Sequence, residues 1–342
     1  MSRMISRCSA SADNATRTPP AMKRKVFFTT LNPNNYTFLA GLSLLQQHGC
    51  SGFEIAKTIQ EADIVLFLEY GYIGVMDLPK IVTLTRSANS GSMHFLFCES
   101  DWPFPVLPGA YPSLANPYSW AHSWSFPPRF SVNGNPQPPL QESEPDLFFS
   151  FLGRVATHAV RSQILIFDGP KTPCLDTADG PRRFRNFDHA RTYADLIRRS
   201  KFVLCPRGFG TSSIRVFETM CLGRVPVIIS DHWQKPPGIP WSDFCIVVPE
   251  RNVSLIPDML ASVEDRAHSM GRLARRIYEE NFGPNVFFDR LLMTLLQKYS
   301  GCSFTLEALF GRACRAAGWR ELRALLQLRA RLHQARSAII GR

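Results

Sequence analysis

Residues 200–231, SKFVLCPRGFGTSSIRVFETMCLGRVPVIISD, constrain the fold of this chain more than any other stretch. Apolar runs at 201–205 and 225–230 flank a glycine-rich turn and a segment whose apolar residues recur at helical spacing. Short apolar runs bounded by turn residues predict buried strands, and the periodic segment predicts a helix that ends at Gly223. Strand, turn, helix and strand in this order form one βαβ unit, which requires a parallel sheet.

The same alternation of strand and helix extends over most of the chain. Further strands are predicted at 25–30, 64–70, 80–85, 94–100, 147–153 and 244–250. Further helices are predicted at 34–49, 53–63, 160–167, 193–200, 254–263, 265–281 and 285–299. Ten of the 26 prolines fall between 101 and 140, where they oppose regular structure, and 132–146 is typical of a linker.

These patterns predict an α/β chain with two Rossmann-like domains in tandem. The predicted divisions are a disordered basic N-terminus (1–24), an N-terminal domain (25–140), a C-terminal domain (146–300) and a basic helical tail (301–342).

The net charge of +11 lies at the two ends of the chain. Residues 1–25 carry six Lys or Arg and one Asp, and residues 311–342 carry eight Arg and one Glu, so the body is close to neutral. A nucleic-acid-binding protein gathers its cations on a folded face, so this distribution argues against that class. The tail also has leucines near helical spacing, which fits either a basic helix on an anionic membrane or a helix packed on the body.

The spacing of the cysteines and the distribution of apolar residues indicate the cellular compartment of the protein. The nine cysteines are scattered without C-x-x-C pairs, which predicts a reducing compartment and no metal site. No stretch reaches the ~18 apolar residues of a membrane span, and the first 25 residues lack the apolar core of a secretory signal. We therefore expect a cytoplasmic protein, free or peripheral to the inner face of a membrane, and not a secreted one.

The glycine-rich turn at 206–212 follows the carboxyl end of a predicted strand, where ligands bind in open parallel sheets. Gly208 and Gly210 let backbone N–H groups approach a ligand, and Ser212 and Ser213 add hydroxyl donors. Free N–H groups and the positive end of the helix dipole favour an anion, most often a phosphate.

Arg215 and Glu218 share one face of the predicted helix. A cation in the first turn opposes the helix dipole unless an anion lies in front of it. A carboxylate close to a phosphate is favourable when it accepts hydrogen bonds from ribose hydroxyls, so the pair predicts a bound nucleoside diphosphate. The alternative is a surface Arg–Glu pair, which contributes only about 0.2–0.5 kcal/mol.

Two known phosphate-binding motifs bear on this site. A P-loop is excluded because no Lys follows the glycines. The dinucleotide fingerprint G-x-G-x-x-G nearly matches at Gly208, Gly210 and Ser213, and Asp231 ends the next predicted strand, in the place of a ribose-binding acid. An NAD(P)-dependent oxidoreductase is therefore an alternative, although it leaves the nearby basic residues and Glu218 unexplained.

Residues 193–231 and their continuation through 239–260 resemble the exostosin-type glycosyltransferases (GT47-like), and LFFSFLGRVATHAVR at 147–161 stands upstream as in that family. The resemblance implies a GT-B fold, in which an acceptor-side domain and a nucleotide-sugar-binding domain face each other across a cleft. It implies that Glu218 holds the ribose and that Arg207 either supports the glycine loop or reaches a phosphate. The residues that it places at the diphosphate or in the turns below it are Gly153, Arg154, Arg161, Gly208, Gly210, Ser212, Ser213 and Arg215.

The resemblance also implies an activity: sugar transfer from a nucleoside-diphosphate sugar, expected to be a UDP-sugar, to a hydroxyl of a glycan or polysaccharide. We expect an inverting reaction without a metal or other cofactor, and the sequence has no Asp-x-Asp triplet. Candidates for the general base are Asp101, Glu99 and Glu69, each of which is equally well explained as a loop-capping carboxylate. A catalytically inactive glycan-binding protein of the same fold is a further alternative.

Four aromatic residues in the proline-rich stretch between 101 and 140 have two possible roles. Trp102, Trp120, Trp124 and Tyr111 either stack on sugar rings or anchor loops in a core.

Overall fold

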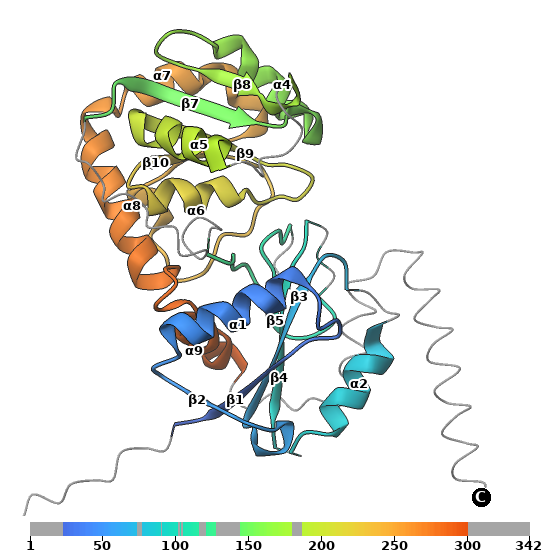
Figure 1. Cartoon of the computed structure of the whole chain (residues 1–342). Coiled ribbons are helices and arrows are strands. Elements are labelled where there is room, and N and C mark those ends of the chain that lie inside the picture. Colours follow the sequence, from blue (N-terminus) through green and yellow to red (C-terminus); the bar gives the residue numbers. More distant parts are fainter. Residues whose placement is uncertain are drawn as a thin grey trace, which may run out of the picture.

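The computed structural model describes residues 23–73, 77–89, 91–101, 103, 105–115, 121–127, 144–179 and 187–299. Two parallel sheets follow one another along the chain, each with helices packed on it (Figure 1). The prediction of two α/β domains is confirmed. The predicted tail at 301–342 lies outside the described residues, as do most of the predicted N-terminal segment and linker.

Within the described residues, the first sheet has six parallel strands in the order β2-β1-β3-β4-β5-β6. They are β1 (Lys25–Thr29), β2 (Glu54–Ile55), β3 (Ile64–Tyr70), β4 (Met93–Glu99), β5 (Gly109–Ala110) and β6 (Ala121–His122). Two helices of this domain pack against it, α1 (Tyr36–His48) and α2 (Leu78–Arg86). Every residue of β3 except Tyr70 is buried, as expected for a strand covered on both faces.

In the part of the chain that the structure describes, the second sheet has five parallel strands in the order β11-β10-β9-β7-β8. They are β7 (Leu147–Gly153), β8 (Cys174–Asp176), β9 (Ser200–Pro206), β10 (Val225–Ile229) and β11 (Ile246–Val248). The helices of this part of the chain are α4 (Ala159–Ile164), α5 (Phe187–Arg199), α6 (Ile214–Cys221), α7 (Ile256–Ala261) and α8 (Ala267–Asn281). The βαβ unit predicted within 200–231 is β9, α6 and β10. Within the described ranges, no helix has the length and apolar character needed to cross a membrane.

Both sheets reverse their strand order beside their first strand. β1 lies between β2 and β3, and β7 lies between β8 and β9. Open α/β sheets bind ligands at such switch points, outside the carboxyl ends of the strands. A ligand site is therefore expected at the residues that follow β1 and β3 in the first domain and β7 and β9 in the second.

The last described helix, α9 (Phe287–Tyr299), returns from the second sheet to the first. α8 runs along the second domain towards the first, and α9 lies beside α1 (Figure 1). The ring of Phe288 packs on that of Phe28 with centroids 4.9 Å apart. The Asp289 carboxylate accepts hydrogen bonds from the backbone N–H groups of Ser51 and Gly52 at 2.9 and 2.8 Å. The predicted C-terminal domain thus contributes a helix to the core of the first.

One apolar core joins the two domains. Trp124 of the first domain packs on Phe282, which follows α8, with ring centroids 5.0 Å apart, and Phe282 lies at the same distance from Phe217 of α6. The Trp233 indole donates a hydrogen bond to the Pro112 carbonyl at 2.8 Å. Because packed aromatic side chains leave few alternative arrangements, these contacts hold the two sheets in one relative position.

Two predicted elements are wrong. The segment 53–63, predicted as a helix, forms the two-residue strand β2 at the sheet edge and a 3-10 turn at Ile59–Glu61. The segment 80–85, predicted as a strand, lies within α2, where Leu78, Ile81 and Val82 are buried at helical spacing. Short apolar runs do not distinguish a strand from one face of a helix, and the packing of the surrounding elements decides.

Candidate functional site

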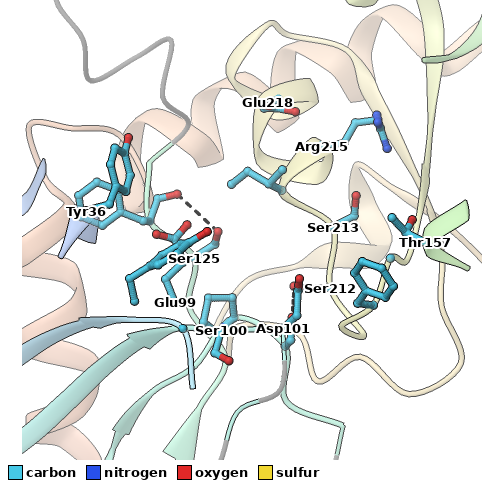
Figure 2. A pocket seen from close by; sticks show the side chains of 18 of the residues that line it. Tyr36, Glu99, Ser100, Asp101, Ser125, Thr157, Ser212, Ser213, Arg215 and Glu218 are labelled. Carbon is cyan, nitrogen blue, oxygen red and sulfur yellow. Dashed lines mark hydrogen bonds between the residues drawn. The ribbon is translucent and has the colours of Figure 1, made fainter. Parts of the chain in front are cut away.

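A pocket of about 610 Å³ lies between the two domains, at the switch points of both sheets (Figure 2). The first domain lines it with Tyr36, Tyr70, Gly71, Tyr72, Glu99, Ser100, Asp101, Pro112, Ser113, Ser125, Phe126 and Pro127. The second domain lines it with Thr157, Arg161, Gly208, Phe209, Ser212, Ser213, Ile214, Arg215 and Glu218. Eight of the residues predicted for the site meet here: Glu99, Asp101, Arg161, Gly208, Ser212, Ser213, Arg215 and Glu218.

The glycine loop brings the amino end of α6 to the pocket. The loop connects the end of β9 at Pro206 to the start of α6 at Ile214. Ser213 is the N-cap residue, and its side chain makes no capping hydrogen bond with the described part of the chain. In the first turn of α6, the Val216 N–H donates to the Ser213 carbonyl at 3.1 Å. The N–H groups before it precede the helical hydrogen-bond ladder, so they and the positive end of the dipole can serve a ligand in the pocket.

Arg215 is buried in the pocket wall, with 8% of its surface exposed. Its Nη2 donates to the Leu152 carbonyl at 2.7 Å, and the guanidinium lies 4.9 Å from the Phe151 ring centroid. Gly153 leaves room for it, because a Cβ there would lie 2.6 Å from Nη2. The Arg215 Nε is buried without a hydrogen-bond partner among the described residues. Because burying an incompletely paired guanidinium is costly, this wall favours an anion as a partner.

Glu218 lies one turn further along α6 and lines the same pocket. Its Oε2 accepts a hydrogen bond from the Tyr193 hydroxyl at 2.6 Å. Burial raises the pKa of Tyr193 well above its ordinary value and the charge of Glu218 adds to this rise, so the hydroxyl remains a donor. Tyr193 therefore orients the carboxylate. Sequence reasoning missed this role, although Tyr193 begins the motif 193–231.

Arg161 joins the turn after β7 to the glycine loop. Its Nε donates to the Arg207 carbonyl at 2.8 Å, Nη1 to the Arg154 carbonyl at 3.0 Å and Nη2 to the Pro206 carbonyl at 3.1 Å. Burial, together with the charge of Arg215, lowers the pKa of Arg161 to about 10. The group stays charged at neutral pH, so two neighbouring guanidinium groups make this wall electropositive.

Two of the predicted arginines lie outside the pocket lining. The Arg154 side chain is exposed, and its carbonyl serves the loop through Arg161. The Arg207 Nη1 lies 3.7 Å from Glu250 Oε1, a contact that supports the loop from outside. Asp231, the acid of the alternative dinucleotide site, is exposed and accepts a hydrogen bond from the backbone of Glu250 at 2.8 Å. It does not line the pocket either.

Gly210 is the point at which the glycine loop touches the first domain. A Cβ on Gly210 would lie 2.9 Å from the backbone oxygen of Asp101 and closer still to Ser113 Oγ. Beside it, the hydroxyls of Ser113 and Ser212 share a hydrogen bond of 2.7 Å. A side chain at position 210 would push the loop away from the first domain, so glycine is needed for this close approach.

Of the three candidate bases, two line the pocket. Asp101 lies beside Ser212, and its Oδ1 would lie 2.9 Å from a Cβ on Gly210 (Figure 2). The Glu99 Oε2 accepts a hydrogen bond from Thr37 Oγ1 at 3.1 Å. Glu69 is 2% exposed and does not line the pocket.

Glu69 instead holds the segment between β1 and α1. Its Oε1 accepts hydrogen bonds from Thr30 Oγ1 and the Leu31 N–H, and its Oε2 accepts one from Asn35 Nδ2. Asn35 is the N-cap of α1, and Tyr36 follows it at the pocket. The carboxylate at the end of β3 therefore shapes the loop that presents Tyr36.

We expect Glu69→Gln to alter how the stability of the chain depends on pH. Burial raises the pKa of Glu69 above its ordinary value, although its hydrogen bonds with Leu31 and Thr30 lower it. With a folded pKa above the unfolded one, the wild-type chain gains stability as pH falls through the folded pKa, and the gain is complete below the unfolded pKa. Urea unfolding in a pH series from 7.5 down to 4.0 should show this gain in the wild type and its loss in Glu69→Gln.

The exposed Glu61 provides a matched control for this measurement. Glu61→Gln should follow the wild-type pH dependence. A Glu69→Gln chain with the same pH dependence as the wild type would show that ionisation of Glu69 is not coupled to folding.

The aromatic residues considered for sugar stacking lie elsewhere. Trp124 is 2% exposed and Tyr111 is fully buried, with its hydroxyl donating to the Leu107 carbonyl at 2.7 Å. For these two, the core interpretation is correct. Trp102 and Trp120 lie outside the described residues.

Other aromatic side chains line the pocket: Tyr36, Tyr70, Tyr72, Phe126 and Phe209. Sequence reasoning missed them, although a signal was present. Tyr70 and Tyr72 come at the end of a predicted strand, where ligands bind in parallel sheets, and Phe209 stands between the two loop glycines.

Comparison with known proteins identifies proteins that are similar to part of this chain. Residues 120–263 match the family model described as Exostosin GT47 domain. The Exostosin-1 homolog of Caenorhabditis elegans is 40% identical over 90 residues, which are 25% of this chain and 24% of that protein. The probable beta-1,4-xylosyltransferase IRX10L of Arabidopsis thaliana is 34% identical over 87 residues, which are 25% of this chain and 21% of that protein.

These matches confirm the resemblance to the exostosin-type GT47 glycosyltransferases that the sequence indicated. The aligned part of the chain spans about a quarter of the length of these curated relatives. A crystal structure of a glycosyltransferase from Rickettsia africae ESF-5 superposes with a TM-score of 0.42 and 8% identity, covering 82% of this chain and 100% of that one.

Proposed function

We propose that this chain, whose residues 120–263 match the exostosin GT47 domain, transfers a sugar from a nucleoside-diphosphate sugar to a hydroxyl of a glycan or polysaccharide. One observation carries the proposal: the amino end of α6, the buried Arg215 and Glu218 meet in a single interdomain pocket. Backbone donors and a guanidinium suit a diphosphate, and a carboxylate suits vicinal hydroxyls. Together they fit a nucleoside diphosphate, which we expect to be UDP.

The donor would lie along α6. Its diphosphate meets the first N–H groups of the helix and Arg215, and Glu218 accepts from the ribose hydroxyls. The sugar then extends across the pocket towards Asp101 of the first domain, which lies against the glycine loop. This placement brings the anomeric carbon between the two domains.

The reaction is a displacement at that carbon. The acceptor oxygen forms a bond to the anomeric carbon while the bond to the diphosphate breaks and its electron pair leaves with the nucleotide. Asp101 takes the proton of the acceptor hydroxyl as general base. Attack from the side opposite the leaving group inverts the configuration of the sugar.

We propose that the leaving diphosphate is stabilised by fixed protein groups. The amino end of α6 and the guanidinium groups of Arg161 and Arg215 lie in the pocket wall where negative charge would develop, and because these groups are held in place by the fold, little reorganisation is needed. Among the described residues, no group of three or more His, Cys, Asp or Glu side chains is placed to bind a metal ion. We expect sugar transfer to continue in the presence of EDTA.

Nucleotide binding tests this proposal. UDP, or GDP if the base differs, should raise the Tm of the full chain in EDTA. Glu218→Ala should remove most of this protection, because hydrogen bonds to a charged group contribute about 1.5–3 kcal/mol, which is about 10–150-fold in Kd. Isothermal titration with UDP measures the change directly.

Glu280→Ala, at an exposed position of α8, is the matched control and should bind nucleotide like the wild type. Protection by NAD(P) instead of UDP or GDP would favour the oxidoreductase alternative. Glycan binding without any effect of nucleotides would favour an inactive glycan-binding protein.

A further inference from the structure

We propose that the first-domain wall of the pocket binds the acceptor as an uncharged saccharide, with a sugar ring packed on Tyr70 and Tyr72 and with Glu99 and Asp101 disfavouring acidic sugars. This inference rests on the proposed function and names the class of its acceptor.

The topology of the first sheet provides the first argument. Its switch point lies between β1 and β3, where crevices outside the carboxyl ends of strands bind ligands. Tyr70 is the last residue of β3, and Tyr36 begins the helix that follows β1. Both tyrosines line the pocket. Figure 2 shows Tyr36 on the side opposite Arg215 and Glu218. Each sheet therefore offers one ligand site to the same pocket, and the second sheet's site suits the nucleotide.

The tyrosines provide the second argument. Tyr70 and Tyr72 line the pocket and are each 53% exposed. Gly71 between them has a φ of 83°, a backbone conformation that residues other than glycine rarely adopt. The Tyr36 and Tyr70 rings meet edge to face, with centroids 6.3 Å apart. Tyrosine supplies rigid contact area with an apolar face and a polar tip at a low entropic cost. A pyranose ring, with C–H groups on its faces and hydroxyls at its edge, matches such a surface.

Charge provides the third argument. Among the described residues of the first-domain wall, Glu99 and Asp101 are the charged side chains. The described cations of the pocket, Arg161 and Arg215, belong to the second domain. A carboxylate or sulfate on the acceptor would meet like charges that it cannot pair, and such juxtaposition is strongly unfavourable. The same hydroxyl-accepting carboxylates suit a neutral sugar.

An oligosaccharide array tests the proposal on the full chain in the presence of UDP. The array carries matched pairs that differ only in the terminal sugar, glucose against glucuronic acid and galactose against galacturonic acid. We expect the neutral member of each pair to be retained at least 10-fold better. Tyr70→Ala and Tyr72→Ala should each lower this retention about 10-fold, and Tyr70→Phe, which keeps the ring, should preserve it.

Two further variants sharpen the test. Glu99→Gln removes one negative charge from the first-domain wall, so the difference in retention between the neutral and the acidic sugar of each pair should become smaller. Ile166→Ala, 72% exposed in the second domain and outside the pocket, is the matched control and should leave retention unchanged.

The outcomes separate this inference from the proposed function. Thermal protection by UDP or GDP is measured on the same samples, and its absence would overturn the proposed function. Protection accompanied by a preference for acidic sugars, by undiminished retention in the tyrosine variants, or by no retention at all would overturn the acceptor inference alone.

Discussion

Asp101→Asn lowers kcat for sugar transfer by about 10²–10⁴-fold, the range that a positioned general base contributes, while nucleotide protection is retained. The amide keeps the shape of the carboxylate but cannot accept the proton of the acceptor hydroxyl. Asp101 lies at the meeting point of the two domains, beside Gly210 and Ser212, where the donor sugar and the acceptor would come together. Initial rates with saturating donor and acceptor, together with UDP titrations, measure the two effects separately.

Glu99→Gln is the informative comparison for this prediction, because Glu99 is the last residue of β4, two residues before Asp101, and lines the same pocket. We expect it to retain kcat within about 10-fold. Asp265→Asn, at an exposed position before α8, is a control for the substitution itself. A full loss in Glu99→Gln with an active Asp101→Asn enzyme would assign the base to Glu99 and contradict our choice.

Arg215→Gln weakens UDP binding by about 10²-fold, because one or two hydrogen bonds from a charged donor to phosphate are lost. The same change removes the stacking of the guanidinium on Phe151 and its bond to the Leu152 carbonyl, so the nucleotide-free chain also unfolds at a lower temperature. Arg215→Lys keeps the positive charge but lacks the planar, forked set of donors, so its affinity for UDP should lie between those of the wild type and Arg215→Gln. Isothermal titration and thermal unfolding without nucleotide distinguish binding from stability.

Arg276→Gln, at an exposed position of α8, is the matched control for loss of an arginine. It should leave both the Kd for UDP and the Tm unchanged. A wild-type Kd in Arg215→Gln would show that the buried guanidinium serves only the packing of β7 and α6, and the anion site would then rest on the helix end alone.

The residues of the glycine loop and of α6 that line the pocket could be predicted from the local sequence. Gly208, Ser212, Arg215 and Glu218 were placed at one ligand-facing helix end from their spacing alone, and the structure brings all four to the pocket. Their relationship depends on a helix that begins within a few residues of the strand before it, so local geometry suffices. The same reasoning did not show that Arg215 is buried or that Tyr193 holds Glu218, because those contacts come from β7 and α5.

Which of the candidate bases lines the pocket could not be predicted from the local sequence. Glu69 and Glu99 lie at corresponding places, each at or next to the carboxyl end of a neighbouring strand. The sequence gives no reason to separate them, yet one is buried under the loop after β1 and the other lines the pocket. The difference arises because Thr30, Leu31 and Asn35 fold over Glu69.

By itself, then, the sequence determined the α/β class, the order of most strands and helices, and the helix end that faces the pocket, because each follows from hydrophobic period and turn chemistry within about 30 residues of chain. Tertiary structure decided which residues of the two domains face each other. That depends on the close approach at Gly210, on the shared aromatic core around Phe282 and on the return of α9 to the first sheet. Each of these joins segments distant in the chain, and their packing is set by shape and volume, which no local pattern encodes.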